Sequence, residues 1–303
     1  MRPISEWFRF PARLFLRCED ERIYAVMRIG FAVAALMNLI DLWPDRHVFF
    51  SDAGMFDADV ARAQAESVYF SIFAFARSGA AVTCCMVVTA LALVMLLAGI
   101  ATRPAAFCVL VWHLSYIARA TPATTGWDMV LRTYSFLVLV SPIGKCWTLP
   151  ALLRRRGKIL PAMVPCYGLV LMRLQVLVIY WQTELRRLVN PDRYWGDGEF
   201  LSYFFLSHHA RWPGRWVLEY GSIFTAATYA IQIAEVAIPV LLWVKKTRWW
   251  GMLLGLVLHA GVSVFARDLG LFFLAMMMTY PAFLRTGDIE AVQGRVKRWI
   301  TRD

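Results

Sequence analysis

Apolar residues in this chain gather into long runs instead of alternating with polar ones. A helix needs about 20 apolar residues to cross the hydrocarbon layer of a bilayer, and eight stretches come near that length. The pattern predicts an all-α integral membrane protein, a polytopic bundle of about eight transmembrane helices. The fourth and last stretches are short, so counts of seven and nine stay open. The predicted spans are residues 23–43, 80–100, 104–121, 128–143, 165–187, 222–244, 249–266 and 269–285.

The basic residues between these stretches predict an orientation. Lysine and arginine favour the cytoplasmic side of a span, and alternate connections divide them 19 against 8. We therefore expect both termini in the cytoplasm. Residues 1–22 would form a cytoplasmic N-terminal segment and residues 286–303 a cytoplasmic tail, in a single membrane domain covering 1–303.

Composition supports the same class. Hydrophobic residues make up 59% of the chain and charged residues 17%, and the mean hydropathy is +0.53. The net charge of +11 would suggest nucleic acid in a soluble protein, but cytoplasmic anchoring accounts for these residues. The lipid bilayer is the expected partner, and no nucleic acid is expected.

Two connections carry features of their own. The outer segment from Pro44 to Gly79 contains an aromatic run at Val68–Ala76, too short to span, which predicts a helix in the interface or a plug on the bundle. The inner connection Lys145–Met163 carries a basic run typical of an anchor facing anionic lipid.

The stretch Tyr180–Trp212 breaks the apolar pattern most sharply. Charged residues end the fifth span, and Asn190–Pro191 predicts a helix break. In the loop that follows, Gly196 and Gly198 are expected to turn the backbone over the mouth of the bundle, with Trp195 at headgroup depth. An ordinary surface loop is the alternative. The loop also contributes two carboxylates, Asp197 and Glu199.

Charged and histidine residues within the spans are expected to face the bundle interior or a cavity. Their depth along each span divides them into two expected layers. The inner layer contains Arg28, Arg173, Glu235 and His259, and the outer layer contains Asp128, Arg132, Glu184 and Arg187. We expect Glu235 to neutralise an inner arginine. Arg173, Glu235, His259 and Trp195 are the candidates for binding a cofactor.

Spacing along the helices leaves two interpretations of each outer charge pair. Asp128 and Arg132 are one turn apart, which fits a self-neutralising pair or a ligand-facing role. Arg187 lies three residues after Glu184 and either pairs with it or clamps a carboxylate or phosphate ligand through its planar guanidinium.

Histidines offer one cofactor hypothesis. His113 and His259 fall within spans and would ligate a b-type haem if their helices faced each other. Packed histidines are the favoured interpretation, because nothing else in the sequence indicates haem. No spacing of cysteine, histidine and carboxylate residues predicts a metal site.

Several segments, in order, resemble the horizontally transferred transmembrane family, the membrane part of the vitamin K-dependent gamma-carboxylases and their bacterial relatives. The resemblance covers nearly the whole chain and implies a location in the bacterial inner membrane. The segments are Met27–Trp43, Leu96–Phe107, Thr124–Leu149, Val178–Leu188, Trp195–Leu201, Glu235–Trp243, Gly255–Phe265 and Phe272–Leu284.

The sequence departs from the family pattern at one functional position. Family members carry, in the segment similar to Tyr180–Leu188, a lysine thought to act as a base toward a reduced quinone. Arg186 and Arg187 stand there instead, and arginine keeps its proton. We expect no vitamin K hydroquinone-dependent carboxylation by this protein alone.

Two function classes stay open. The first is a membrane enzyme whose outward polar site acts on a quinone-like or lipid-like ligand; its candidate catalytic residues are Glu184, Arg187, Asp128, Arg132, Asp197 and Glu199. The second is a non-catalytic membrane subunit or maturation factor with a membrane or secreted peptide partner. A transporter would show two similar halves, and the sequence shows no such symmetry.

Overall fold

The computed structural model describes residues 15, 17–64, 70–144, 146–153, 162–189, 193–267 and 269–300. The chain divides into two compact units. Unit 1 contains Met1–Leu171 and Leu284–Asp303, and unit 2 contains Met172–Phe283. The break expected at Asn190–Pro191 lies outside the described residues, as do parts of the segments expected at Val68–Ala76 and Lys145–Met163.

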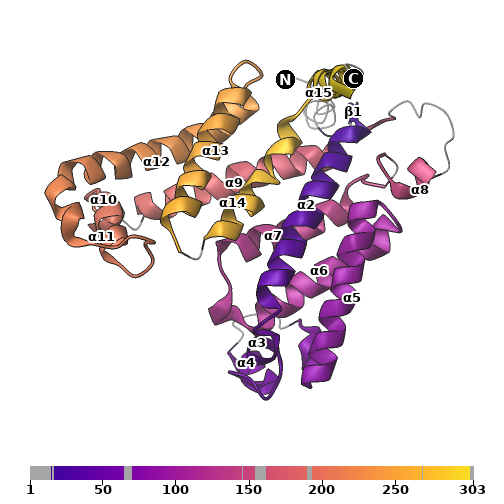
Figure 1. Cartoon of the computed structure of the whole chain (residues 1–303), viewed down its shortest axis with the longest axis horizontal. Coiled ribbons are helices and arrows are strands. Elements are labelled where there is room, and N and C mark those ends of the chain that lie inside the picture. The colour runs from indigo at the N-terminus through magenta and orange to yellow at the C-terminus, as the bar shows by residue number, and fades with distance from the viewer. Residues whose placement is uncertain are drawn as a thin grey trace, which may run out of the picture. The chain divides into compact units, whose positions relative to one another are not determined.

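Four helices build the core of unit 1. Helices α5 and α7 each pack against both α2 and α6 (Figure 1). Their interior is closed by large side chains that are almost wholly buried, among them Phe31, Met86, Trp112 and Tyr134. The four helices are α2 (Glu21–Leu42), α5 (Gly79–Ala98), α6 (Thr102–Arg119) and α7 (Gly126–Val140).

Short elements close one end of this core. Phe73 in η1 is fully buried and stacks on Phe50 of α3 at 5.3 Å between ring centroids, and both rings meet Trp112 edge-on. The described part of the aromatic run therefore plugs the bundle as a 3-10 turn. These elements are α3 (Arg46–Phe50), α4 (Ala58–Ala63), η1 (Ile72–Ala74) and η2 (Thr121–Ala123).

The structure also contains a two-stranded antiparallel sheet, which the predicted all-α class did not include. Strand β1 (Cys18–Asp20) pairs with β2 (Met163–Pro165), directly before α2 and α9 respectively. Tyr24 ties the pair to α2 by donating to the carbonyl of Pro165 at 2.9 Å. Three-residue strands leave no periodic signal in a sequence, so hydropathy could not predict them. Unit 1 also contains α8 (Leu149–Leu153) and α15 (Thr286–Ile300).

Unit 2 is organised around α9 and a helical hairpin. Helices α12 and α13 lie side by side, joined by a short turn (Figure 1). Smaller elements connect α9 to this hairpin and follow it along the chain. The elements are α9 (Tyr167–Val189, from Met172 onward in unit 2), α10 (Arg193–Gly196), α11 (Phe200–Leu206), η3 (Arg215–Tyr220), α12 (Gly221–Trp243), α13 (Arg248–Phe265), α14 (Gly270–Met277) and η4 (Tyr280–Phe283).

All eight predicted stretches coincide with helical segments, the last divided between α14 and η4. Four helical segments of the described chain are long and apolar enough to cross a bilayer: Glu21–Leu42, Gly79–Ala98, Arg215–Trp243 and Arg248–Phe265. The other helices of the described chain are shorter or less apolar, as α9 is with its charged residues. The fold is therefore mostly helical and compatible with a membrane protein, and the count of about eight spans stays a prediction.

Exposed apolar side chains fit a lipid-facing surface. On α5 the exposed residues include Val87, Val88, Leu91 and Val94. Proteins that are soluble in water rarely expose contiguous apolar areas of this kind. In a bilayer, the same side chains contact acyl chains at no desolvation cost.

Candidate functional site

Arg187, near the end of α9, is the centre of a polar cluster in unit 2. One terminal nitrogen, Nη1, bonds to Glu184 on the same helix and lies 2.5 Å from Oε2 of Glu235 on α12. Side-chain exposure is 8% for Glu184, 17% for Arg187 and 18% for Glu235. The predicted pairing of Arg187 with Glu184 is confirmed, and a second carboxylate shares the same guanidinium.

Glu235 corrects the expected two-layer arrangement. We expected it in an inner layer, neutralising Arg28 or Arg173, but it joins the outer charges around Arg187. Arg28 donates instead to the carbonyls of Ile143 and Trp147 at 2.8 and 2.7 Å. Depth counted along separate helices fails here because it ignores how the helices are tilted and shifted along their axes.

Trp195 covers one face of the Arg187 guanidinium. The Cζ atom of Arg187 lies 3.4 Å from the centroid of the indole ring, a cation–π contact. Phe200 of α11 stacks on the same indole at 3.9 Å between centroids. The planar guanidinium is thus fixed by an aromatic face and two carboxylates, a set of contacts that a lysine could not reproduce.

The loop carrying Trp195 folds back against α12. The backbone carbonyl of Trp195 accepts a hydrogen bond from Gln232 at 3.2 Å, and that of Gly196 accepts one from Tyr229 at 3.0 Å. Gly198 has a φ of +72°, as expected, whereas Gly196 is the last residue of α10. The loop therefore packs on the helices, although its depth in a bilayer stays a prediction.

Glycine is required at position 198 for a second reason. A Cβ atom there would lie 2.7 Å from Cγ2 of Thr225 and 2.9 Å from a ring carbon of Tyr229. The loop comes this close to a polar stripe on α12, whose residues share one face of the helix. The stripe consists of Thr225, Thr228, Tyr229, Gln232 and Glu235.

Asp197 and Glu199 do not join the cluster. Both are exposed, and Glu199 precedes α11 without a side-chain capping bond. In the described part of the chain no ion pair joins either carboxylate to Arg187, and their place in an outward catalytic group stays a prediction.

Asp128, in unit 1, has a structural role. Its carboxylate accepts hydrogen bonds from Asn38 at 3.0 Å, from Tyr116 at 2.6 Å and from the backbone and hydroxyl of Thr125 at 2.7 and 2.9 Å. Thr125 and Asp128 form the capping box that begins α7. Among the ion pairs of the described residues none joins Asp128 to Arg132, so the predicted self-neutralising pair is wrong.

Two further candidates are engaged within unit 2. Arg173 donates through Nε to the carbonyl of Ala282 at 2.7 Å. His259 shares a hydrogen bond through Nε2 with the hydroxyl of Tyr180 at 2.6 Å, and that hydroxyl lies 2.5 Å from the hydroxyl of Tyr280. The nitrogen that would ligate haem iron is thus already hydrogen-bonded.

Sequence reasoning missed the chain formed by Tyr180, His259 and Tyr280. All three side chains are buried. Gly255 makes room for it, because a Cβ atom there would lie 1.8 Å from the hydroxyl oxygen of Tyr280. Two features of the sequence could have indicated this chain. Tyr180 lies one turn before Glu184 on α9, and Gly255 lies one turn before His259 on α13.

An apolar groove runs along α9 beside the cluster. It has a volume of about 400 Å³. Its polar members, Gln182 and Glu184, stand among leucine, valine and tryptophan side chains. The lining residues are Leu177, Val178, Trp181, Gln182, Glu184, Leu185, Leu188 and Val236.

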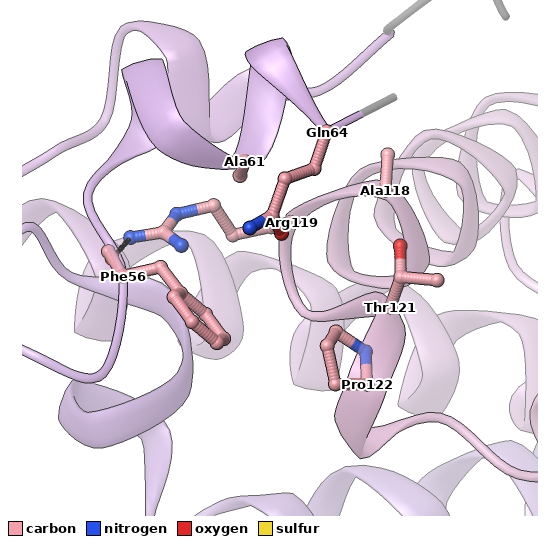
Figure 2. A pocket seen from close by; sticks show the side chains of 7 residues that line it. All are labelled: Phe56, Ala61, Gln64, Ala118, Arg119, Thr121 and Pro122. Carbon is pink, nitrogen blue, oxygen red and sulfur yellow. Dashed lines mark hydrogen bonds between the residues drawn. The ribbon is translucent and has the colours of Figure 1, made fainter. Parts of the chain in front are cut away.

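A smaller pocket of about 140 Å³ lies beside Arg119 at the end of α6. Figure 2 shows the Arg119 side chain reaching toward Phe56, whose backbone carbonyl it bonds. The guanidinium also donates to the carbonyl of Ser51 at 3.0 Å and lies 3.6 Å from Asp52. These contacts hold the segment that contains Ser51 and Phe56 on α6 and explain how a basic residue is buried there.

An ion pair in the exposed segment between α2 and α5 shifts the pKa of its carboxyl. Arg77 donates to both oxygens of Asp59, at 2.8 and 2.9 Å, and holds the pKa of that carboxyl below its usual value.

Comparisons with known proteins identify no family for the chain. No family model matches it, and neither a curated protein nor a solved structure matches it. Within the described ranges, histidine, cysteine, aspartate and glutamate side chains form no group of three or more that would hold a metal ion.

Proposed function

We propose that this chain is a multi-pass protein of the bacterial inner membrane, related to the horizontally transferred transmembrane family. It has about eight spans and both termini in the cytoplasm. Eight helical segments and the 19-to-8 division of basic residues support this topology. Helix α9, with 23 residues, is about 35 Å long and sufficient to cross the hydrocarbon layer despite its charges.

The proposed activity is binding of a lipid-like or quinone-like ligand along the outer half of α9. The observation that carries this proposal is the continuity between the apolar groove and the charged cluster, since Glu184 belongs to both. An apolar tail would replace bilayer lipid along Leu177, Leu185 and Leu188. Its polar head would then reach Glu184 within the groove lining.

Hydrogen-bonding capacity decides which head group fits. Two carboxylates share one guanidinium nitrogen, so the cluster carries an excess of acceptors. Because Nη1 of Arg187 already donates to both acids, the arrangement argues against the anion clamp that the sequence left open for Arg187. A neutral head group with a hydroxyl donor, such as a quinol, complements Glu184.

Chemistry at this site would use the carboxylates. Arg187 is permanently protonated and bonded to both acids, so it cannot act as a base. In the enzyme hypothesis, Glu184 would accept a proton from a ligand hydroxyl as the acid–base step. Carboxylation in the manner of the vitamin K-dependent enzymes is not proposed.

A non-catalytic subunit or maturation factor is the second candidate. It is favoured by the ion pairs of Arg187 with Glu184 and Glu235, which suffice for a purely structural role. In that case the groove would contain bulk lipid, and the functional partner would be a membrane or secreted peptide.

Equilibrium binding of a tritiated isoprenoid quinol to the full chain in nanodiscs tests the proposal. Leu185→Trp should fill the groove and weaken binding by about tenfold, the effect of roughly 1.4 kcal/mol of steric cost. Leu174→Trp is the matched control, because Leu174 is an exposed leucine of α9 outside the groove lining. Equal binding by both variants and the unaltered chain would reject the groove as the site.

A further inference from the structure

Helix α15 is fixed to the first turn of a candidate span. Arg22 of α2 donates through Nη1 to the side chain of Gln293 at 2.7 Å and lies 3.5 Å from Glu290. Ile289 of α15 is also buried. Figure 1 shows α15 beside the start of α2. Because α2 is long and apolar enough to cross a bilayer, its first turn lies near a bilayer surface, and α15 lies there with it.

The exposed side of α15 is both apolar and basic. Val292 is 60% exposed and Trp299 is 76% exposed. Arg295 lies between them on one helical face, at spacings of three and four residues, and Arg298 is also exposed. The acidic residues Asp288 and Glu290 fall in the first half of the helix, where Glu290 meets Arg22.

We propose that α15 is an interfacial helix that binds anionic lipid headgroups. Its second half contains Arg295, Lys297 and Arg298 and no acidic residue, which matches a negatively charged leaflet. Tryptophan favours the headgroup region, and exposed valine favours the acyl boundary. Helix α15 would thereby hold the start of α2 at a fixed depth. This site is separate from the ligand groove of unit 2.

Amide hydrogen exchange of the full chain tests the proposal. In nanodiscs of phosphatidylcholine mixed with phosphatidylglycerol, residues 294–300 should exchange more slowly than in phosphatidylcholine alone. Each basic residue at an anionic surface contributes about a fivefold effect, so the slowing should exceed tenfold. The double substitution Arg295→Glu with Arg298→Glu should abolish the dependence on lipid charge.

Two controls make the outcome specific. Arg62→Glu reverses an exposed basic residue on α4 and should leave the lipid dependence unchanged. Exchange of α5 should be the same in all variants, which shows that unit 1 remains folded. The proposal is overturned if residues 294–300 exchange equally in both lipids, or if the charge-reversed chain keeps the difference.

Discussion

Arg187 shows, at the scale of a single residue, how a charge is made tolerable near an apolar environment. Its guanidinium contacts Glu184, Glu235 and the face of Trp195. Removing one partner from a buried ion pair costs more than the pair contributes, because the remaining charge stays desolvated. The cluster is therefore sensitive to any change that leaves its two carboxylates without a cation.

Arg187→Ala should lower the free energy of unfolding by about 3 kcal/mol, since Glu184 and Glu235 would repel each other without compensation. Denaturant titration of the purified chain in micelles measures this effect. Arg186→Ala is the matched control, because Arg186 directly precedes Arg187 and is exposed. It should change stability by less than about 0.5 kcal/mol. Equal effects of the two substitutions would show that the cluster has no special role in stability.

Tyr180 is the second sensitive residue, because its hydroxyl is the middle member of a buried chain. Tyr180→Phe should cost about 1 to 2 kcal/mol by leaving His259 and Tyr280 each without a partner. Tyr194→Phe serves as the control, since Tyr194 is exposed. A Tyr180→Phe chain with unchanged thermal stability would contradict the hydrogen-bonded chain.

At the scale of elements, contacts between residues close in sequence could be predicted, and contacts between residues far apart in sequence could not. The three-residue spacing of Glu184 and Arg187 was sufficient to predict their contact. Glu235 follows 48 residues after Arg187, and only the packing of α12 on α9 brings it there. The spacing of Thr125 and Asp128 was an available capping-box signal, but the competing Arg132 at one turn suggested an ion pair.

The loop between α10 and α11 gives a prediction at this scale. Gly198→Ala should destabilise the chain by about 2 kcal/mol, because alanine strains at positive φ and its Cβ atom would meet Thr225 and Tyr229. Gly261→Ala in α13, where a Cβ atom would have no neighbour within 4 Å, should be neutral or slightly stabilising. Thermal unfolding of both variants makes the comparison, and a neutral Gly198→Ala would contradict the packed loop.

At the scale of the whole molecule, the predicted helical class agrees with the structure, while crossing the membrane is a separate question. Hydropathy located eight helical segments because apolar runs mark them directly. Within the described residues, four segments meet the length and composition needed to span. The charged residues of α9 lower its mean hydropathy. Glu184 and Arg187 pair with each other, and a composition measure cannot recognise such a contact.

The topology can be tested by reporter fusions. Fusions after Arg103 and Lys246 should report the cytoplasm, and fusions after Ala63 and Trp212 should report the opposite side, because basic residues are retained in the cytoplasm during insertion. Fusions at Ala63 and Lys246 that report the same side would contradict the eight-span arrangement.

The most direct test of ligand binding beside Arg187 is photolabelling with an isoprenoid quinol that carries a diazirine on its tail. The full chain in nanodiscs would be irradiated, digested and mapped by mass spectrometry. The account predicts labelling concentrated on Leu177, Trp181, Leu185 and Val236, competed by unlabelled quinol and lost in Leu185→Trp but not in Leu174→Trp. Labelling spread over the exposed apolar faces of α5, α12 and α13, without competition, would contradict it.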